Sequence, residues 1–186
     1  GATSIRPCTV DLRLLMIGDS ITQGWESEYD SMTYAYALSR DLRASSNIQG
    51  VGGAYYDEST LDAIPFEPDV VTVAYGTNDY DMRPSLSVMR EHVSAFLDGI
   101  ADLYAGKKIF VLSPIWRDRR NAKMGRFEDC RALIIEEAAK RNMIHIDGLK
   151  MVPPIPSLFS DAFLHPNALG FAYYAENVVR EIQKHL

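Results

Sequence analysis

Short apolar runs alternate along the chain with longer stretches whose apolar residues recur at helical spacing. The runs are continuous and rich in aliphatic residues, which is typical of strands covered on both faces. Strands that alternate with helices of this length predict βαβ units, a parallel sheet and right-handed crossovers. We expect strands over 12–18, 47–53, 69–76, 108–114 and 143–147, and helices over 29–44, 84–105, 126–142 and 167–186.

Five parallel strands with helices on both faces predict an α/β fold of the flavodoxin-like, doubly wound kind, with three layers (α/β/α). The 186 residues are expected to form a single domain, 1–186. Ligands of such sheets bind beyond the carboxyl ends of the strands. Function is therefore expected around Ser20, Gly53, Asn78 and the segment after Pro114, which lie where predicted strands end.

Charge and composition narrow the classes of function. The formal net charge of −6 argues against a general nucleic-acid-binding role, because that role needs a basic face. No apolar run reaches the roughly 18 residues of a membrane span, so no span is expected. Cys8 and Cys130 lack metal-ligand spacing and are expected to be free thiols. No metal or cofactor site is predicted, and the oligomeric state and the compartment are left open.

The first strand stops at Gly18-Asp19-Ser20, so Ser20 is presented between a strand and a helix. A helix N-terminus offers free N–H groups and a partial positive charge, which suits a developing oxyanion. A serine here can equally be a plain turn or cap residue, and it does not lie in a G-x-S-x-G elbow. The interpretation therefore depends on whether the rest of the chain supplies partners for a nucleophile.

Partners for a nucleophilic serine are present. Asp161 and His165 share a short loop before the last helix, and a histidine base oriented by a carboxylate is what such a serine needs. Gly50, Gly52 and Gly53 lie at the end of the second strand, and Asn78 follows the third. A glycine N–H and an asparagine amide, together with the N–H of Ser20, make three donors for one oxyanion.

Four blocks of sequence resemble those of the GDSL-type, or SGNH, hydrolase family, and they occur in the family's order. They are GDSITQG (18–24), QGVGG (49–53), GTND (76–79) and DAFLHPN (161–167).

The resemblance implies the SGNH hydrolase fold and a serine ester hydrolase without a cofactor. It implies Ser20 as nucleophile, His165 as base, Asp161 as the carboxylate that orients it, and an oxyanion hole of Ser20, Gly53 and Asn78. The stretches SPIWR (113–117) and HPNALGF (165–171) further resemble small bacterial members, often active on acetylated or otherwise acylated carbohydrates.

Two details depart from the family's pattern or leave a choice. The family has two residues between the Asp and the His, whereas here there are three, 162–164. Either the extra residue bulges out and Asp161 stays against the imidazole, or Asp161 misses it and a backbone carbonyl orients the ring. Gly50, Gly52 and Gly53 are close in sequence, and Gly53 is favoured because it meets the family's G-x-x-G spacing with Gly50.

Aromatic residues gather near the expected rim of the site, where flat rings with polar edges could stack on sugars or line an acyl pocket. The candidate substrate-binding residues are Trp25, Tyr55, Tyr80, Trp116 and Arg117. Asp19 and Asp79 are expected to fix loops through backbone N–H groups, not to act as acid or base.

The sequence thus predicts hydrolysis of short acyl esters, with acetyl groups on a carbohydrate as the expected substrate. A lysophospholipase or thioesterase, and an acyltransferase that uses the same chemistry, are the enzyme alternatives. A non-catalytic ligand-binding domain of this fold and a flavin-binding electron carrier are the alternatives from other classes.

Overall fold

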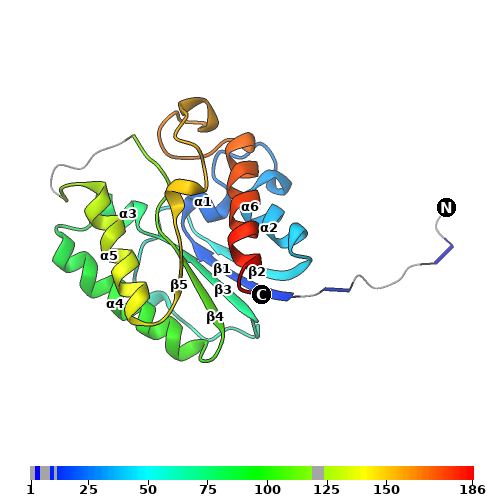
Figure 1. Ribbon diagram of the computed structural model, residues 1–186, viewed down its shortest axis with the longest axis horizontal. Helices are drawn as coiled ribbons and strands as arrows, with labels where there is room; N and C mark the ends of the chain where they lie inside the picture. Colours follow the sequence, from blue (N-terminus) through cyan, green and yellow to red (C-terminus); the bar gives the residue numbers. More distant parts are fainter. Residues whose placement is uncertain (1–2, 5–8, 11, 119–123) are drawn as a thin grey trace.

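The computed structural model describes residues 3–4, 9–10, 12–118 and 124–186, so Cys8 lies outside the described residues. Within these ranges, one five-stranded sheet has the order β2-β1-β3-β4-β5, and every neighbouring pair is parallel (Figure 1). The strands are β1 (Leu12–Gly18), β2 (Ala44–Gly50), β3 (Val70–Ala74), β4 (Lys108–Leu112) and β5 (Ile144–Ile146). The predicted flavodoxin-like order is confirmed.

Helices cover both faces of the sheet, which confirms the three layers (Figure 1). On one face α2 (Tyr34–Asp41) packs against α6 (Ala168–Gln183), and on the other α4 (Leu86–Leu103) packs against α5 (Phe127–Lys140). Two short helices, α1 (Ser20–Gln23) and α3 (Thr77–Met82), follow β1 and β3. In the part of the chain that the structure describes, the connections contain four 3₁₀ turns: η1 (Asp30–Met32), η2 (Glu58–Thr60), η3 (Gly148–Lys150) and η4 (Pro156–Leu158).

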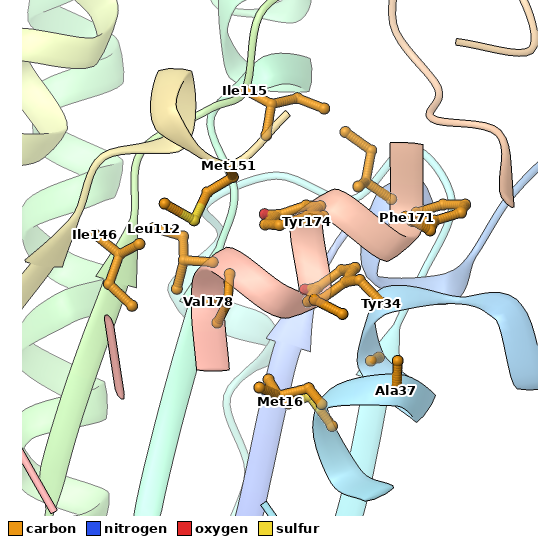
Figure 2. Packing of buried hydrophobic residues seen from close by; sticks show 14 of the residues in the cluster. Met16, Tyr34, Ala37, Leu112, Ile115, Ile146, Met151, Phe171, Tyr174 and Val178 are labelled. Atoms are coloured by element: carbon orange, nitrogen blue, oxygen red, sulfur yellow. The ribbon is translucent and has the colours of Figure 1, made fainter. Parts of the chain in front are cut away.

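The core has two halves, one on each face of the sheet. Along β1, Leu14 and Met16 join the half under α2 and α6, while Leu15 and Ile17 join the half under α4 and α5. This alternation follows from the two-residue period of a strand. Figure 2 shows the first half, where Met16 lies below a pair of stacked rings, Tyr34 and Tyr174, whose centroids are 4.2 Å apart. Cys130 is a buried free thiol in the second half.

The boundaries of two predicted elements were wrong. β2 runs over Ala44–Gly50 instead of 47–53, because its sequence, ASSNIQG, is that of a partly exposed edge strand and not a continuous apolar run. Residues 51–53 form a turn after it. The helix expected from residue 29 begins only at Tyr34, where the Thr33 side chain accepts a hydrogen bond from Tyr36 N.

The sheet order changes direction between β1 and β3, and this is where flavodoxin-like sheets bind ligands. The carboxyl ends of β2, β1 and β3 are level, because Gly18 pairs with Gly50 on one side and with Ala74 on the other. The segments that follow these three strands therefore start side by side at one edge of the sheet.

Candidate active site

Ser20 is the first residue of α1 and is 8% exposed. Asp19 caps this helix, with its Oδ1 accepting a hydrogen bond from Ile21 N at 2.9 Å. The helix packs tightly on the end of β2, since a Cβ at Gly50 would lie 2.2 Å from Gln23 N. Only a glycine at position 50 therefore allows α1, which carries Ser20, to pack this closely on β2.

The hydroxyl of Ser20 meets the imidazole of His165, with 2.9 Å between Oγ and Nε2. His165 lies in the loop before α6 and is fixed on both sides. Its carbonyl accepts a hydrogen bond from Ser160 N at 2.8 Å. Two residues later, Asn167 caps α6 through a hydrogen bond from Gly170 N to its Oδ1 at 3.1 Å.

Asp161 faces the other nitrogen of the same imidazole, with 2.7 Å between Oδ2 and His165 Nδ1. Of the two outcomes left open by the sequence, the structure therefore places Asp161 against the ring. The three intervening residues are accommodated because Ala162 adopts a left-handed conformation, with φ of +64°. This local turn keeps the loop tight enough for a carboxylate to reach the histidine four residues later.

The second carboxylate oxygen of Asp161 accepts hydrogen bonds from three backbone N–H groups. Oδ1 accepts from Phe163 at 3.0 Å, from Leu164 at 2.8 Å and from His165 at 3.1 Å. Partial burial acts to raise the pKa of Asp161, but these hydrogen bonds and the one from the imidazole outweigh it, so the pKa is lowered. Asp161 is consequently an anion held in one orientation. That anion favours a proton on Nδ1 of His165 and leaves Nε2 to accept from Ser20.

Asn78 and Gly53 are linked through Ala54. Asn78 is in the first turn of α3, and its Nδ2 donates to the carbonyl of Ala54 at 2.8 Å. One hydrogen of the amide makes this bond, which leaves the second to donate elsewhere. Gly53 directly precedes Ala54 in an exposed turn and has φ of +78°, a conformation that favours glycine.

The carboxylates of Asp19 and Asp79 are buried and bind backbone N–H groups, as expected for loop-fixing residues. Asp79 accepts from Tyr56 N, with 3.3 Å to each oxygen. Burial raises the pKa of Asp19 to about 7, and the charge of Asp79 adds to this. Burial also raises the pKa of Asp79 to about 6, although the Tyr56 hydrogen bond and Arg83 oppose the shift.

Three of the aromatic candidates lie next to segments that carry site residues and are exposed or half-buried. Trp25 is 54% exposed, and its N donates to the carbonyl of Ser20 at 2.8 Å. Tyr55 is half-buried beside Ala54. Trp116 is half-buried and packs on Phe159, which pairs with the residue after His165. These rings can therefore line the approach to the serine.

The placement of Tyr80 and Arg117 corrects the expectation that they line the rim. Tyr80 is 1% exposed and donates to the carbonyl of Gly125 at 2.7 Å. The guanidinium of Arg117 is buried and donates to Thr77, and its second nitrogen lies 2.8 Å from an oxygen of Asp81. Both residues face inward because they anchor α3 to neighbouring segments, a demand that the local sequence pattern does not reveal.

Sequence reasoning missed Arg83. It follows α3 directly, four residues after Asp79, and its Nε lies 3.5 Å from Asp79 Oδ1. It also donates to the carbonyl of Tyr56, and its guanidinium lies 4.4 Å from the centre of the Tyr55 ring. The i, i+4 spacing of opposite charges on a helical segment was a usable signal.

Among the described residues, no group of three or more His, Cys, Asp or Glu side chains is arranged to hold a metal ion. None of the helices in these ranges is both long enough and apolar enough to cross a membrane.

Comparison with known proteins gives a family and a fold. Residues 16–173 match the model of the GDSL-like lipase/acylhydrolase family. A protein from Lactobacillus plantarum has a similar structure, with a TM-score of 0.79, 22% identity, and coverage of 96% of this chain and 99% of that one. The lipase/acylhydrolase from Enterococcus faecalis has a TM-score of 0.76 and 21% identity, covering 94% and 97%.

A carbohydrate esterase is also among the structural neighbours. An active-site mutant of a family two carbohydrate esterase from Clostridium thermocellum has a TM-score of 0.73 and 20% identity, over 96% of this chain and 65% of that one. At these identities the structural likeness shows the fold alone. No curated protein matches the chain.

Proposed function

The chain belongs to the GDSL-like lipase/acylhydrolase family and is a hydrolase of the esterase type, and we propose that Ser20, His165 and Asp161 remove short acyl groups, acetyl in particular, from carbohydrates. The observation that carries this proposal is one continuous chain of hydrogen bonds. It runs from Ser20 Oγ to His165 Nε2 at 2.9 Å and from Nδ1 to Asp161 Oδ2 at 2.7 Å. These are the contacts that a serine nucleophile, its base and the orienting carboxylate require.

The reaction proceeds in two halves. Ser20 Oγ attacks the ester carbonyl while His165 Nε2 takes the hydroxyl proton, and the tetrahedral intermediate collapses when the imidazolium returns that proton to the leaving alcohol. Water then attacks the acyl-serine, again with His165 as base, and releases the acid and the free hydroxyl. Asp161 stabilises the imidazolium in both halves and stays ionised.

The negative charge that develops on the carbonyl oxygen needs fixed donors. The N–H of Ser20, the N–H of Gly53 and the amide of Asn78 fill this role in our proposal. Ser20 and Asn78 begin the segments that follow β1 and β3, whose carboxyl ends are level. Donors held by a folded framework need no reorganisation when the charge appears, which is the main source of their catalytic effect.

The accessible rings favour a carbohydrate ester as substrate. Trp25 is bonded through its backbone to Ser20, Trp116 packs on Phe159, which pairs with the residue after His165, and Tyr55 follows the residue that accepts from Asn78. Rings with polar edges near the site suit a sugar as substrate. The family two carbohydrate esterase of similar fold supports the same choice.

Substitution of the nucleophile tests this proposal. Ser20→Ala should abolish hydrolysis of p-nitrophenyl acetate and of an acetylated sugar, while circular dichroism shows an unchanged fold. Ser45→Ala, at an exposed position of β2, is the matched control and should keep the wild-type rate. Hydrolysis by the Ser20→Ala protein at the wild-type rate would refute the mechanism.

A second candidate function, hydrolysis of longer acyl chains, is favoured by the lipase/acylhydrolase of similar fold. A series of p-nitrophenyl esters from acetate to palmitate separates the two. Our proposal predicts that kcat/KM is highest for acetate and falls with chain length, and a rise toward the long esters would favour a lipase-like substrate.

A further inference from the structure

The turn that carries Gly53 has few anchors of its own. After β2 ends at Gly50, this turn contains one internal backbone hydrogen bond, from Ala54 N to the carbonyl of Val51 at 3.0 Å. Gly53 is exposed, and a Cβ built there would meet nothing within 4 Å, so packing does not hold it. Val51 N donates to the carbonyl of Gly18 at 3.0 Å and fixes the start of the turn, so on its other side the donor depends on contacts made by the residues just after Gly53.

The ring of Tyr56 is buried against Tyr75 and Phe96, and the polar side-chain contacts of this segment come from α3 and the residue that follows it. Asn78 donates to the carbonyl of Ala54 at 2.8 Å, and the carboxylate of Asp79 accepts from Tyr56 N at 3.3 Å. Arg83 donates to the carbonyl of Tyr56. The peptide groups on both sides of Tyr55 are therefore tied to α3.

Arg83 completes this arrangement from two directions. Its charge lies 3.5 Å from the buried Asp79 carboxylate, and its guanidinium covers the ring of Tyr55 at 4.4 Å. The Asp79 side chain is 0% exposed and that of Arg83 is 13% exposed. A buried ion pair contributes little net stability, because the cost of desolvation offsets the attraction. The ion pair is therefore better explained by a role in positioning the residues that it contacts.

We propose that Arg83 is a positioning residue for the oxyanion hole: with Asp79 it holds the Gly53 turn on α3, so that Gly53 and Asn78 donate to the same oxygen. This inference rests on the proposed function, because it assigns Arg83 to the hole of that mechanism. Without Arg83 the turn keeps the Asn78 contact but loses one of the two polar side chains that bind the backbone of Tyr56. Displacement of a catalytic group by about 1 Å can lower turnover about 100-fold.

A double-mutant cycle between Arg83 and Asn78 tests the proposal. Arg83→Met keeps most of the side-chain volume and removes the charge and the donors. We expect kcat on p-nitrophenyl acetate to fall about 10- to 100-fold, with KM nearly unchanged. Asn78→Ala should lower kcat about 100- to 1,000-fold. The double variant should be much less impaired than the product of the two effects, because both substitutions act on one hole.

Two controls keep the outcome interpretable. Arg40→Met removes an exposed arginine paired with Asp41 and should leave kcat unchanged. Arg83→Lys keeps a charge near Asp79 but lacks the planar guanidinium with its several donors, so its kcat should lie between those of the wild type and Arg83→Met. If Arg83→Met does not fold, Arg83→Lys replaces it in the double-mutant cycle.

The failures of the two proposals are distinguishable. A wild-type kcat in Arg83→Met or Arg83→Lys, or effects of Arg83 and Asn78 that multiply, would overturn the positioning role even if Ser20→Ala is inactive. Full activity of Ser20→Ala would instead overturn the proposed function itself. A loss of melting temperature in Arg83→Met with kcat unchanged would mean that Arg83 is only structural.

Discussion

Ser20 Oγ lies 2.9 Å from Nε2 of His165, although 145 positions separate the two residues in the chain. The contact joins the start of α1, after the first strand of the sequence, to the loop before α6, the last helix. It exists because α6 returns across the same face of the sheet that α2 covers, which brings its N-terminal end to the carboxyl end of β1 (Figure 1). The fold therefore holds the start of α1 and the loop before α6 together, so a substitution in the loop is expected to affect the reactivity of Ser20.

Asp161→Asn should separate the orienting role of this side chain from its role in the loop. The amide oxygen of asparagine can still accept the three backbone N–H groups that Oδ1 accepts now, so the loop should keep its shape. An amide nitrogen beside Nδ1 would donate to it and place the imidazole proton on Nε2, which disables the base. We expect kcat to fall about 10,000-fold. Asp118→Asn, at an exposed position nearby, should have no effect, and a loss below tenfold in Asp161→Asn would mean that another group orients His165.

Gly53→Ala and Gly106→Ala form a matched pair. Both glycines have φ of +78°, both are exposed, and a Cβ at either would meet nothing within 4 Å. Each substitution should therefore lower the free energy of unfolding by a similar amount, about 1 kcal/mol, because alanine is strained in this conformation. Only Gly53→Ala should also lower kcat, since it alone disturbs a proposed oxyanion donor. Urea unfolding and ester hydrolysis measure the two effects, and equal kcat values in the two variants would remove Gly53 from the hole.

Stability is expected to fall with rising pH because of Asp19. Burial raises its pKa from 3.8 to about 7, so between these values the folded state holds a proton that the unfolded chain has released. The free energy of unfolding that Asp19 contributes then decreases as the pH rises through this window. Asp19→Asn can keep the cap on Ile21 and has no carboxyl group to titrate.

The measurement is the free energy of unfolding of both proteins at pH 4.5 and at pH 8. Relative to the wild type, Asp19→Asn should gain stability at pH 8 and gain much less at pH 4.5. A difference between the two proteins that is the same at both pH values would show that Asp19 does not titrate in this window.

Arg117→Ala should affect stability and not substrate binding. The side chain is 0% exposed and donates to Thr77 and to Asp81, so its removal takes away these hydrogen bonds and a buried ion-pair partner. We expect a loss of about 3 kcal/mol in the free energy of unfolding. The KM of the folded variant for an acetylated sugar should match that of the wild type, and a KM raised tenfold or more would return Arg117 to the substrate-binding residues. Arg40→Ala, which removes an exposed ion pair, should cost below about 1 kcal/mol.

Much of the fold follows from the sequence read locally. The apolar runs that predict β1, β3 and β4 are buried on both faces, and the alternation of strands and helices is sufficient to predict a parallel, doubly wound sheet. β2 was misplaced by three residues because an edge strand has no continuous apolar run for periodicity to detect. The short helix α3 was missed for a related reason, since six residues are too few to show a helical period.

For the candidate site, too, one part could be predicted from the sequence and another could not. The types and order of Ser20, Gly53, Asn78, Asp161 and His165 are visible in the sequence, and so is their place at strand ends, because a parallel sheet presents all its carboxyl ends at one edge.

Whether Asp161 reaches the imidazole was decided by the left-handed turn at Ala162 and the three N–H groups around Oδ1. Contacts with segments more than twenty residues away decided the inward placement of Tyr80 and Arg117. They also decided the hydrogen bond from Arg83 to the carbonyl of Tyr56. Hydrophobic periodicity reports which face of an element is buried. The direction of a single polar side chain depends instead on which distant donors and acceptors the fold brings within about 3 Å, and only the tertiary structure contains that information.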